Sequence, residues 1–100
     1  MHFAVTARDA TDKDVLARRL AARAEHLEGV ARLQAEGKLI LGAALLNEAG
    51  EMCGSLMVFD APSKAELESW LQADTYTRNT VWGSIEITAC KIAPCFLPRS

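Results

Sequence analysis

The chain has 100 residues and a formal net charge of −2, and half of its residues are hydrophobic. This length fits one small domain over residues 1–100, although chains of this size are often helped by association with a second copy. The sequence has no basic cluster, which argues against nucleic acid as a partner, and no apolar run of about 20 residues, which argues against a membrane span.

The first predicted elements are a strand and a long helix. Residues 2–7, HFAVTA, are short, apolar and partly β-branched, as is typical of a strand. Thr11 and Asp14 have the spacing of a capping box, which predicts the start of a helix. Strong helix formers then continue up to Gly37, which predicts the helix end. A break near residues 21–24 is left open.

A hairpin and a second helix are predicted next. Residues 38–46 and residues 53–60 are largely apolar and predict two strands, joined by the glycine-containing turn NEAGE. Ser63 is the expected N-cap of a helix over residues 64–73. Residues 74–83 are expected to be irregular or to form one short helical turn.

The last predicted strand covers residues 84–92, and the tail PCFLPRS follows it. The order β-α-β-β-α-β predicts an α+β, ferredoxin-like fold, with a four-stranded antiparallel sheet and both helices on one face. All four strands carry apolar residues in both alternating positions, as with Phe3 and Val5 against Ala4. Monomeric antiparallel sheets usually have one polar face, so we expect a homodimer that packs sheet on sheet.

Polar side chains lie beside the apolar stripe of the first helix. That stripe is expected to consist of Leu16, Leu20, Leu27, Val30 and Leu33. Arg19, Arg23 and His26 stand at i, i+4 and i+7 and overlap it. Unpaired burial of such groups is costly. They either reach solvent at the rim of the core or form a site, and the spacing leaves both interpretations open.

Asp74 is the second unusual position, because it closes the predicted helix over residues 64–73. It can serve as the N-cap of the following turn, TYT. It can also orient a neighbouring imidazole, and the two interpretations are compatible.

Several segments resemble the YciI-like (YCII-related) family. They are RRLAARAEHLEGVARLQAEGKLILGAAL, with its R-x-x-H-L pattern, GSLMVFDAPSKAELESWLQADTY, and VWGSIEI. The resemblance implies a ferredoxin-like fold that dimerises into an α+β barrel. It also implies a His–Asp pair in a pocket, which falls on His26 and Asp74, with the family arginine on Arg23 and the family tyrosine on Tyr76. Thr75 replaces the proline that follows the aspartate in the family.

The sequence therefore suggests a small cofactor-free enzyme that acts by isomerisation or elimination on a small oxygenated compound, a class that includes aromatic compounds. Histidine has an ordinary pKa of about 6.5 and can exchange protons near neutral pH, which suits His26 as general acid and base. Asp74 is expected to orient the ring, and Arg23, Arg19 and Tyr76 are expected to bind substrate. Within the family that the chain resembles, one characterised kind removes chloride from a hydroxylated aromatic ring, and the broader barrel superfamily includes lactone isomerases and monooxygenases. The alternative is a non-catalytic module that binds a small molecule.

The cysteines indicate a cellular location and argue against a metal site. Cys53, Cys90 and Cys95 are odd in number and form no C-x-x-C pair, as is typical of reduced thiols. The N-terminus lacks the apolar segment of a signal peptide. We therefore expect a cytoplasmic protein, with no metal and no cofactor.

Overall fold

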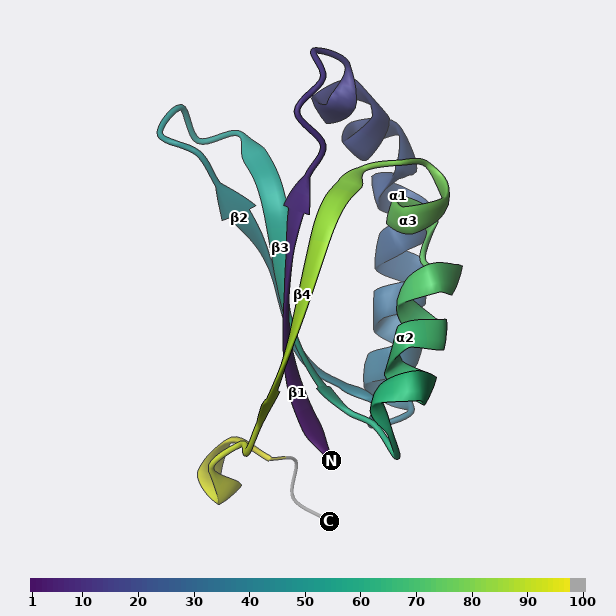
Figure 1. The fold of residues 1–100 in the computed structure, drawn as a ribbon, viewed down its shortest axis with the longest axis vertical. Helices are drawn as coiled ribbons and strands as arrows, with labels where there is room; N and C mark the ends of the chain where they lie inside the picture. Colours follow the sequence, from purple (N-terminus) through teal and green to yellow (C-terminus); the bar gives the residue numbers. More distant parts are fainter. Residues whose placement is uncertain (98–100) are drawn as a thin grey trace.

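The computed structural model describes residues 1–97, and its elements follow the predicted order (Figure 1). The last residues of the predicted tail, 98–100, lie outside the described part. The strand boundaries differ from the predicted ones by at most two residues: the first strand ends later, and the last strand begins and ends earlier. The elements are β1 His2–Asp9, α1 Val15–Ala35, β2 Leu39–Leu46, β3 Met52–Asp60, α2 Lys64–Ala73, α3 Thr75–Arg78, β4 Trp82–Cys90 and the 3-10 turn η1 Pro94–Phe96.

The four strands form one antiparallel sheet in the order β2-β3-β1-β4. β1 lies in the interior of the sheet, where Val5 faces Met57 of β3 on one side and Ile87 of β4 on the other. Both long helices lie on the same face of the sheet (Figure 1). This is the ferredoxin-like α+β fold that the sequence predicts.

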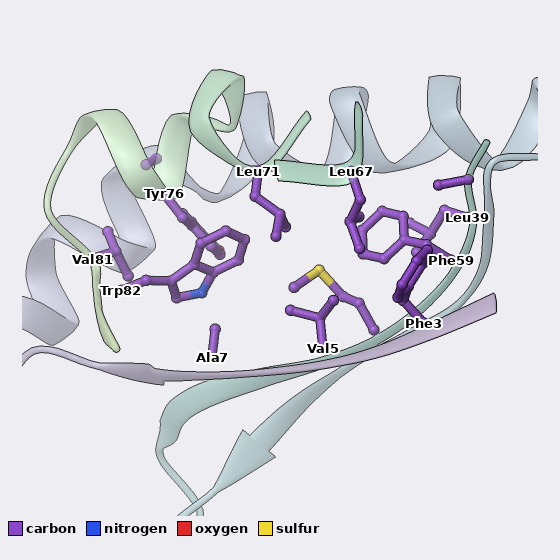
Figure 2. Close-up of a cluster of buried hydrophobic side chains, with 13 residues drawn as sticks. Phe3, Val5, Ala7, Leu39, Phe59, Leu67, Leu71, Tyr76, Val81 and Trp82 are labelled. Carbon is purple, nitrogen blue, oxygen red and sulfur yellow. The ribbon is translucent and has the colours of Figure 1, made fainter. Parts of the chain in front are cut away.

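The core lies between the sheet and the two helices (Figure 2). Alternate residues of β1 enter it, because successive side chains of a strand point to opposite faces. Leu67 and Leu71 of α2 close it from above (Figure 2). At one end of the core, Tyr76 and Trp82 bring aromatic rings and polar atoms next to α1. The buried members of this core are Phe3, Val5, Ala7, Ala22, Leu39, Met57, Phe59, Ala61, Leu67, Leu71, Tyr76, Val81 and Trp82.

The face of α1 that meets the sheet differs from the predicted leucine stripe. Leu20 is 55% exposed and Leu27 is 44% exposed, so this part of the prediction is wrong. The buried residues of α1 are Arg19, Ala22 and His26. The two polar residues, Arg19 and His26, have hydrogen-bond partners on neighbouring segments, so the side of α1 that faces the sheet need not be apolar. The helix runs without a break through residues 21–24.

The start of α1 also differs from the prediction. The helix begins at Val15, with Asp14 in the N-cap position and no side-chain capping bond, so the Thr11–Asp14 capping box is not formed. Asp12 takes this role in part, because its Oδ2 accepts a hydrogen bond from the Asp14 amide at 3.2 Å. The helix ends as predicted, with Gly37 at a positive φ of 75°, where glycine is favoured.

Arg18 joins the start of α1 to the segment before β4. Its Nη1 and Nη2 donate to the Asp12 carboxylate at 2.6 and 2.8 Å. Its Nη2 and Nε also donate to the backbone carbonyls of Thr80 and Asn79, at 2.9 and 3.2 Å. The Arg18 guanidinium therefore joins the segment before α1 to the segment before β4.

We expect Asp12 to titrate far below an ordinary aspartate. The hydrogen bond from Arg18 lowers the pKa of Asp12 from 3.8 to about 2. A carboxyl with a lowered folded-state pKa stabilises the fold above its unfolded pKa, and that contribution is lost as pH falls through the folded pKa. The Asp12 carboxyl carbon, followed by NMR, should titrate near pH 2 in the wild type and move towards 3.8 in Arg18→Met. A wild-type midpoint near 3.8 would show that the pair is not formed in solution.

The second face of the sheet carries no helix among residues 1–97 (Figure 1). Over β2 and β3 this face is apolar, with Leu41 opposite Val58 and Ala43 opposite Leu56. Over β4 it is polar, because Ile85 and Ile87 pack against the core and the residues that alternate with them are Ser84, Glu86 and Thr88. The expectation of apolar residues in both positions therefore fails for β4. Within the described residues, no helix has the length and apolar character needed to cross a membrane.

Candidate functional site

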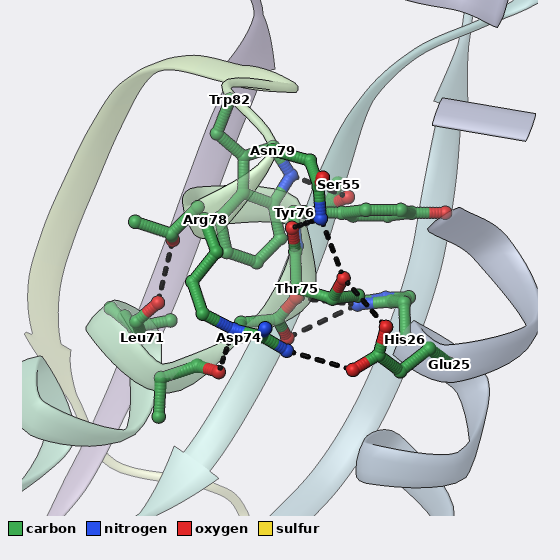
Figure 3. A network of polar contacts seen from close by, with 12 residues as sticks. Glu25, His26, Ser55, Leu71, Asp74, Thr75, Tyr76, Arg78, Asn79 and Trp82 are labelled. Carbon is green, nitrogen blue, oxygen red and sulfur yellow. Dashed lines mark hydrogen bonds and ion pairs between the residues drawn. The ribbon is translucent and has the colours of Figure 1, made fainter. Parts of the chain in front are cut away.

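The structure brings His26 of α1 and Asp74 together. The Nδ1 atom of His26 lies 2.9 Å from Oδ1 and 3.1 Å from Oδ2 of Asp74 (Figure 3). The exposed fractions of the two side chains are 10% and 14%. The two residues are 48 positions apart in sequence, so the contact depends on the packing of α1 against the segment that follows α2.

Asp74 has a second task, because it also caps the short helix α3. Its Oδ1 accepts a hydrogen bond from the Tyr76 amide at 2.8 Å. Asp74 terminates α2 with an extended backbone and starts α3 directly afterwards. The two interpretations offered by the sequence therefore hold together. Thr75 stands where the resembled family has a proline. In this chain the hydrogen bond to the Tyr76 amide holds the Asp74 carboxylate in place without that proline.

Aromatic rings fix the plane of the imidazole. Tyr76 stacks on His26, with ring centroids 3.8 Å apart and an interplanar angle of 11°. Trp82 meets the same imidazole edge-on, at 5.9 Å and 88°. A carboxylate can only accept hydrogen bonds, so Nδ1 of His26 carries the proton in this pair and a neutral ring presents the lone pair of Nε2. Nε2 makes no hydrogen bond to any of the described residues.

A cavity of about 150 Å³ adjoins the imidazole. It lies between α1, the middle of β2 and β3, and Tyr76. Its wall contains two arginines and no carboxylate or amide side chain. The lining residues are Arg19, Arg23, His26, Leu27, Val30, Gly42, Ala43, Ala44, Met52, Ser55, Met57 and Tyr76.

Arg19 forms the buried polar floor beside this cavity. The residue is 2% exposed, and its Nη1 donates to Oδ1 of Asp9 at 2.7 Å. Its Nη2 donates to the Gly54 carbonyl at 2.9 Å and to the Ser55 hydroxyl at 3.0 Å. The guanidinium carbon also lies 4.7 Å from the centre of the Tyr76 ring. Arg19 is thus held by protein partners, although the sequence suggested a residue that binds substrate directly.

Asp9 and Ser55 are the residues of this cluster that sequence reasoning missed. Asp9 lies beyond the predicted strand over residues 2–7, but β1 extends as far as Asp9, and this places its carboxylate beside Arg19. Ser55 lies inside the predicted strand over residues 53–60, and no sequence motif around it indicates a functional role. The one signal in the sequence is the position of Ser55 in the same alternating row of β3 as Met57 and Phe59, which makes it a buried polar residue.

Burial and charge shape the acidity of two groups in this region. Burial raises the pKa of the Tyr76 phenol, and the positive charges of Arg19 and Arg23 offset this in part. Burial also raises the pKa of Asp9, and the Arg19 guanidinium opposes that shift. The Tyr76 hydroxyl therefore stays protonated near neutral pH and can act as a hydrogen-bond donor.

Arg23 differs from Arg19 because its guanidinium has no protein partner among residues 1–97. It is exposed and lines the cavity, and within residues 1–97 it makes neither a hydrogen bond nor an ion pair. Arginine carries five donors and no acceptor, so a free guanidinium at a cavity favours a ligand with negative or oxygen-rich groups. The idea that polar side chains of α1 reach solvent therefore fits Arg23 but not Arg19 or His26.

On the side away from the cavity, a polar clamp holds α3 against α1. Arg78 donates to Oε1 of Glu25 at 2.8 Å, and the Thr75 hydroxyl donates to Oε2 of the same residue at 3.2 Å (Figure 3). The hydrogen bond from Arg78 lowers the pKa of Glu25. The clamp adjoins Asp74 and supports its position relative to His26.

In the part of the chain that the structure describes, no three His, Cys, Asp or Glu side chains are grouped to hold a metal ion.

The family of the chain follows from a comparison with protein-family models. The model of the YCII-related domain matches residues 1–91. The chain belongs to this family. No match is found among curated proteins.

Solved structures show the same fold. The 5-chloro-2-hydroxyhydroquinone dehydrochlorinase of Burkholderia phenoliruptrix, in complex with 2,5-dihydroxybenzoquinone, is 23% identical, with a TM-score of 0.80, over 93% of this chain and 96% of that one. Muconolactone isomerase is 25% identical, with a TM-score of 0.60, over 94% and 92%. A Mycobacterium tuberculosis protein is 16% identical, with a TM-score of 0.57, over 94% and 99%.

Proposed function

We propose that this YCII-related protein is a small enzyme that carries out general acid and base chemistry on a small oxygenated compound, with His26 as the proton-transferring group. The observation that carries the proposal is the contact of His26 Nδ1 with Asp74, which leaves Nε2 without a partner among residues 1–97 on a ring that lines the cavity. Positioned general bases of this kind contribute roughly 10²- to 10⁴-fold to rate.

The chemistry follows from the tautomer. Neutral His26 removes a proton from a carbon next to a carbonyl group, and the electron pair moves onto the carbonyl oxygen to form an enolate. The imidazolium that results is stabilised by the Asp74 carboxylate. In an isomerisation, His26 returns the proton to another atom of the same molecule. In an elimination, the electron pair returns from the oxygen and expels an anionic leaving group, so no oxidant or reductant is required.

The remaining residues receive distinct roles in this proposal. The uncommitted Arg23 holds the enolate oxygen, since a guanidinium is a strong donor to developing negative charge. Tyr76 keeps the imidazole plane fixed and offers its protonated hydroxyl to the ligand. Arg19 positions Tyr76 and the floor of the cavity and does not contact the substrate.

The relatives named above suggest the class of substrate. One is named for the removal of chloride from a chlorinated hydroxyhydroquinone and is bound to a dihydroxybenzoquinone, and the other is named for the isomerisation of a lactone. Both compounds are small, cyclic and oxygenated. The cavity next to His26, with two arginines and no carboxylate side chain, is compatible with compounds of this kind.

Two assays on the purified wild type test this function. Chloride release from 5-chloro-2-hydroxyhydroquinone reports elimination, and NMR of muconolactone in D₂O reports isomerisation and exchange of protons on carbon. Turnover in either assay that requires His26 supports the enzyme. Binding of these compounds without turnover or exchange would favour the alternative, a non-catalytic ligand-binding module.

We also propose a homodimer in which the apolar half of the free sheet face is covered by a second copy. Leu41, 52% exposed on this face, supports the proposal. Sedimentation velocity of the wild type should give about twice the mass of one chain. Leu41→Lys should shift the protein towards the monomer, because it places a charge in an apolar contact. The matched variant Thr88→Lys, on the polar β4 side, should remain dimeric. A monomeric wild type would remove this proposal.

A cytoplasmic location completes the proposal. Its support is that Cys53, Cys90 and Cys95 are all free thiols, as is common in reducing compartments.

A further inference from the structure

The hydroxyl group of Ser55 is held between two donors that cannot accept. The indole Nε1 of Trp82 donates to Ser55 Oγ at 3.2 Å, and Nη2 of Arg19 donates to the same oxygen at 3.0 Å. A serine hydroxyl has two lone pairs and one hydrogen to donate. Both lone pairs of Ser55 are therefore occupied, and its hydrogen must point towards a third partner.

Within residues 1–97, that third partner is missing. Ser55 Oγ donates to no carbonyl, carboxylate or hydroxyl of the described chain, whereas Ser69 and Thr77 donate to backbone oxygens. Ser55 is 4% exposed and lines the cavity next to His26. Tyr76, which stacks on the imidazole, lines the same cavity as Ser55. The hydrogen of Ser55 is thus a donor of fixed direction with no acceptor among residues 1–97.

We infer that Ser55 is a specificity-determining residue, whose hydroxyl donates to an acceptor oxygen of the ligand in the cavity. This inference rests on the proposed function, because it requires that the cavity beside His26 is the ligand site. Trp82 and Arg19 act as positioning residues, since each uses one lone pair of Ser55 and so leaves the hydroxyl no alternative but to donate.

The same logic restricts the ligand. Arg23 offers only donors, Tyr76 is a protonated phenol, and Ser55 is forced to donate. His26, whose ring also lines the cavity, has Nδ1 engaged by Asp74, so Nε2 is its nitrogen left to accept a proton. A complementary ligand therefore presents several acceptor oxygens, carbonyl or anionic, and one acidic hydrogen that faces the imidazole. A ligand with ammonium or amide donors would leave these protein donors unpaired, which is costly in a buried site.

The test measures binding of 2,5-dihydroxybenzoquinone, a compound with four oxygens on one ring, by isothermal titration calorimetry. Ser55→Ala should raise the Kd about tenfold or more, because the site loses a hydrogen bond to a charged or strongly polarised oxygen. Ser55→Thr, which keeps the hydroxyl, should recover most of this affinity. In a turnover assay the alanine variant should raise KM more than it lowers kcat, whereas loss of His26 should lower kcat.

A second variant avoids the buried change at Ser55 itself. Trp82 does not line the cavity, and Trp82→Phe frees one lone pair of Ser55, so the hydroxyl can turn away from the ligand. The Kd should rise several-fold while urea unfolding shows a folded protein. Equal affinities of wild type, Ser55→Ala and Trp82→Phe would overturn the role of Ser55 and leave the role of His26 intact. Failure of the wild type to bind the compound would count against both.

Discussion

His26→Ala should lower kcat by roughly 10²- to 10⁴-fold, the range that a positioned general acid or base contributes. The physical reason is that Nδ1 is engaged by Asp74 at 2.9 Å, so Nε2 is the atom left to exchange a proton with the substrate. Turnover is measured with the substrate that the wild type converts. The substitution should also open a slot against Tyr76, which stacks on the ring at 3.8 Å. Added imidazole should enter this slot and restore part of the activity.

Rescue by imidazole separates a chemical role from a structural one. A variant inactive because it is misfolded would not recover when a small base is supplied. His2→Gln is the matched control, because it changes the other histidine, which accepts from the Ile92 amide at 2.9 Å and does not line the cavity. Its kcat should equal that of the wild type. An active His26→Ala protein would show that proton transfer runs through another group.

Arg19→Met should destabilise the protein by about 3–5 kcal/mol, the usual cost of leaving a buried charge without its partner. Asp9, with a side chain 4% exposed, would lose its ion pair, while the Gly54 carbonyl and the Ser55 hydroxyl would each lose a donor. The pKa of Asp9, already raised by burial, should rise further without the guanidinium that opposes the shift. Urea unfolding followed by circular dichroism measures the change in midpoint.

Arg78→Met provides the comparison for Arg19→Met. Arg78 pairs with Glu25, but their side chains are 54% and 63% exposed, so solvent screens the interaction. We expect a much smaller loss of stability than in Arg19→Met. The double variant Asp9→Leu with Arg19→Met should recover part of the lost stability, since it removes both charges together. Similar losses in the two single variants would contradict the burial argument.

The fold could be predicted because it depends on local patterns. Alternating apolar residues, helix formers and stop signals such as Gly37 and Ser63 each act over a few neighbouring positions, and their order limits the topology. The inward face of α1 could not be predicted in the same way. Leu20 and Leu27 have helical spacing, but Arg19 takes the buried position because Asp9 compensates its charge across ten residues of sequence.

The candidate site was predictable in part. His26 and Asp74 stood out by position and by resemblance, and the structure places them in contact. The sequence could not assign Arg19 and Arg23 different tasks, because both arginines stand on one side of the same helix. Their difference arises from the ends of β1 and β3, which meet one of them and not the other. Ser55 was missed for the same reason: its partners, Arg19 and Trp82, come from two other elements.

The sharing of one Asp74 oxygen between the α3 cap and the imidazole has a consequence for how this protein can change over evolution. A mutation of Asp74 removes both the contact with His26 and the cap of α3 at Tyr76. The opposite wall is made by Gly42, Ala43 and Ala44 of β2, and a Cβ at Gly42 would meet nothing within 4 Å. If His26 acts as proposed, new substrate preferences can arise by a larger side chain at Gly42 of β2, while the wall that holds His26 stays constant.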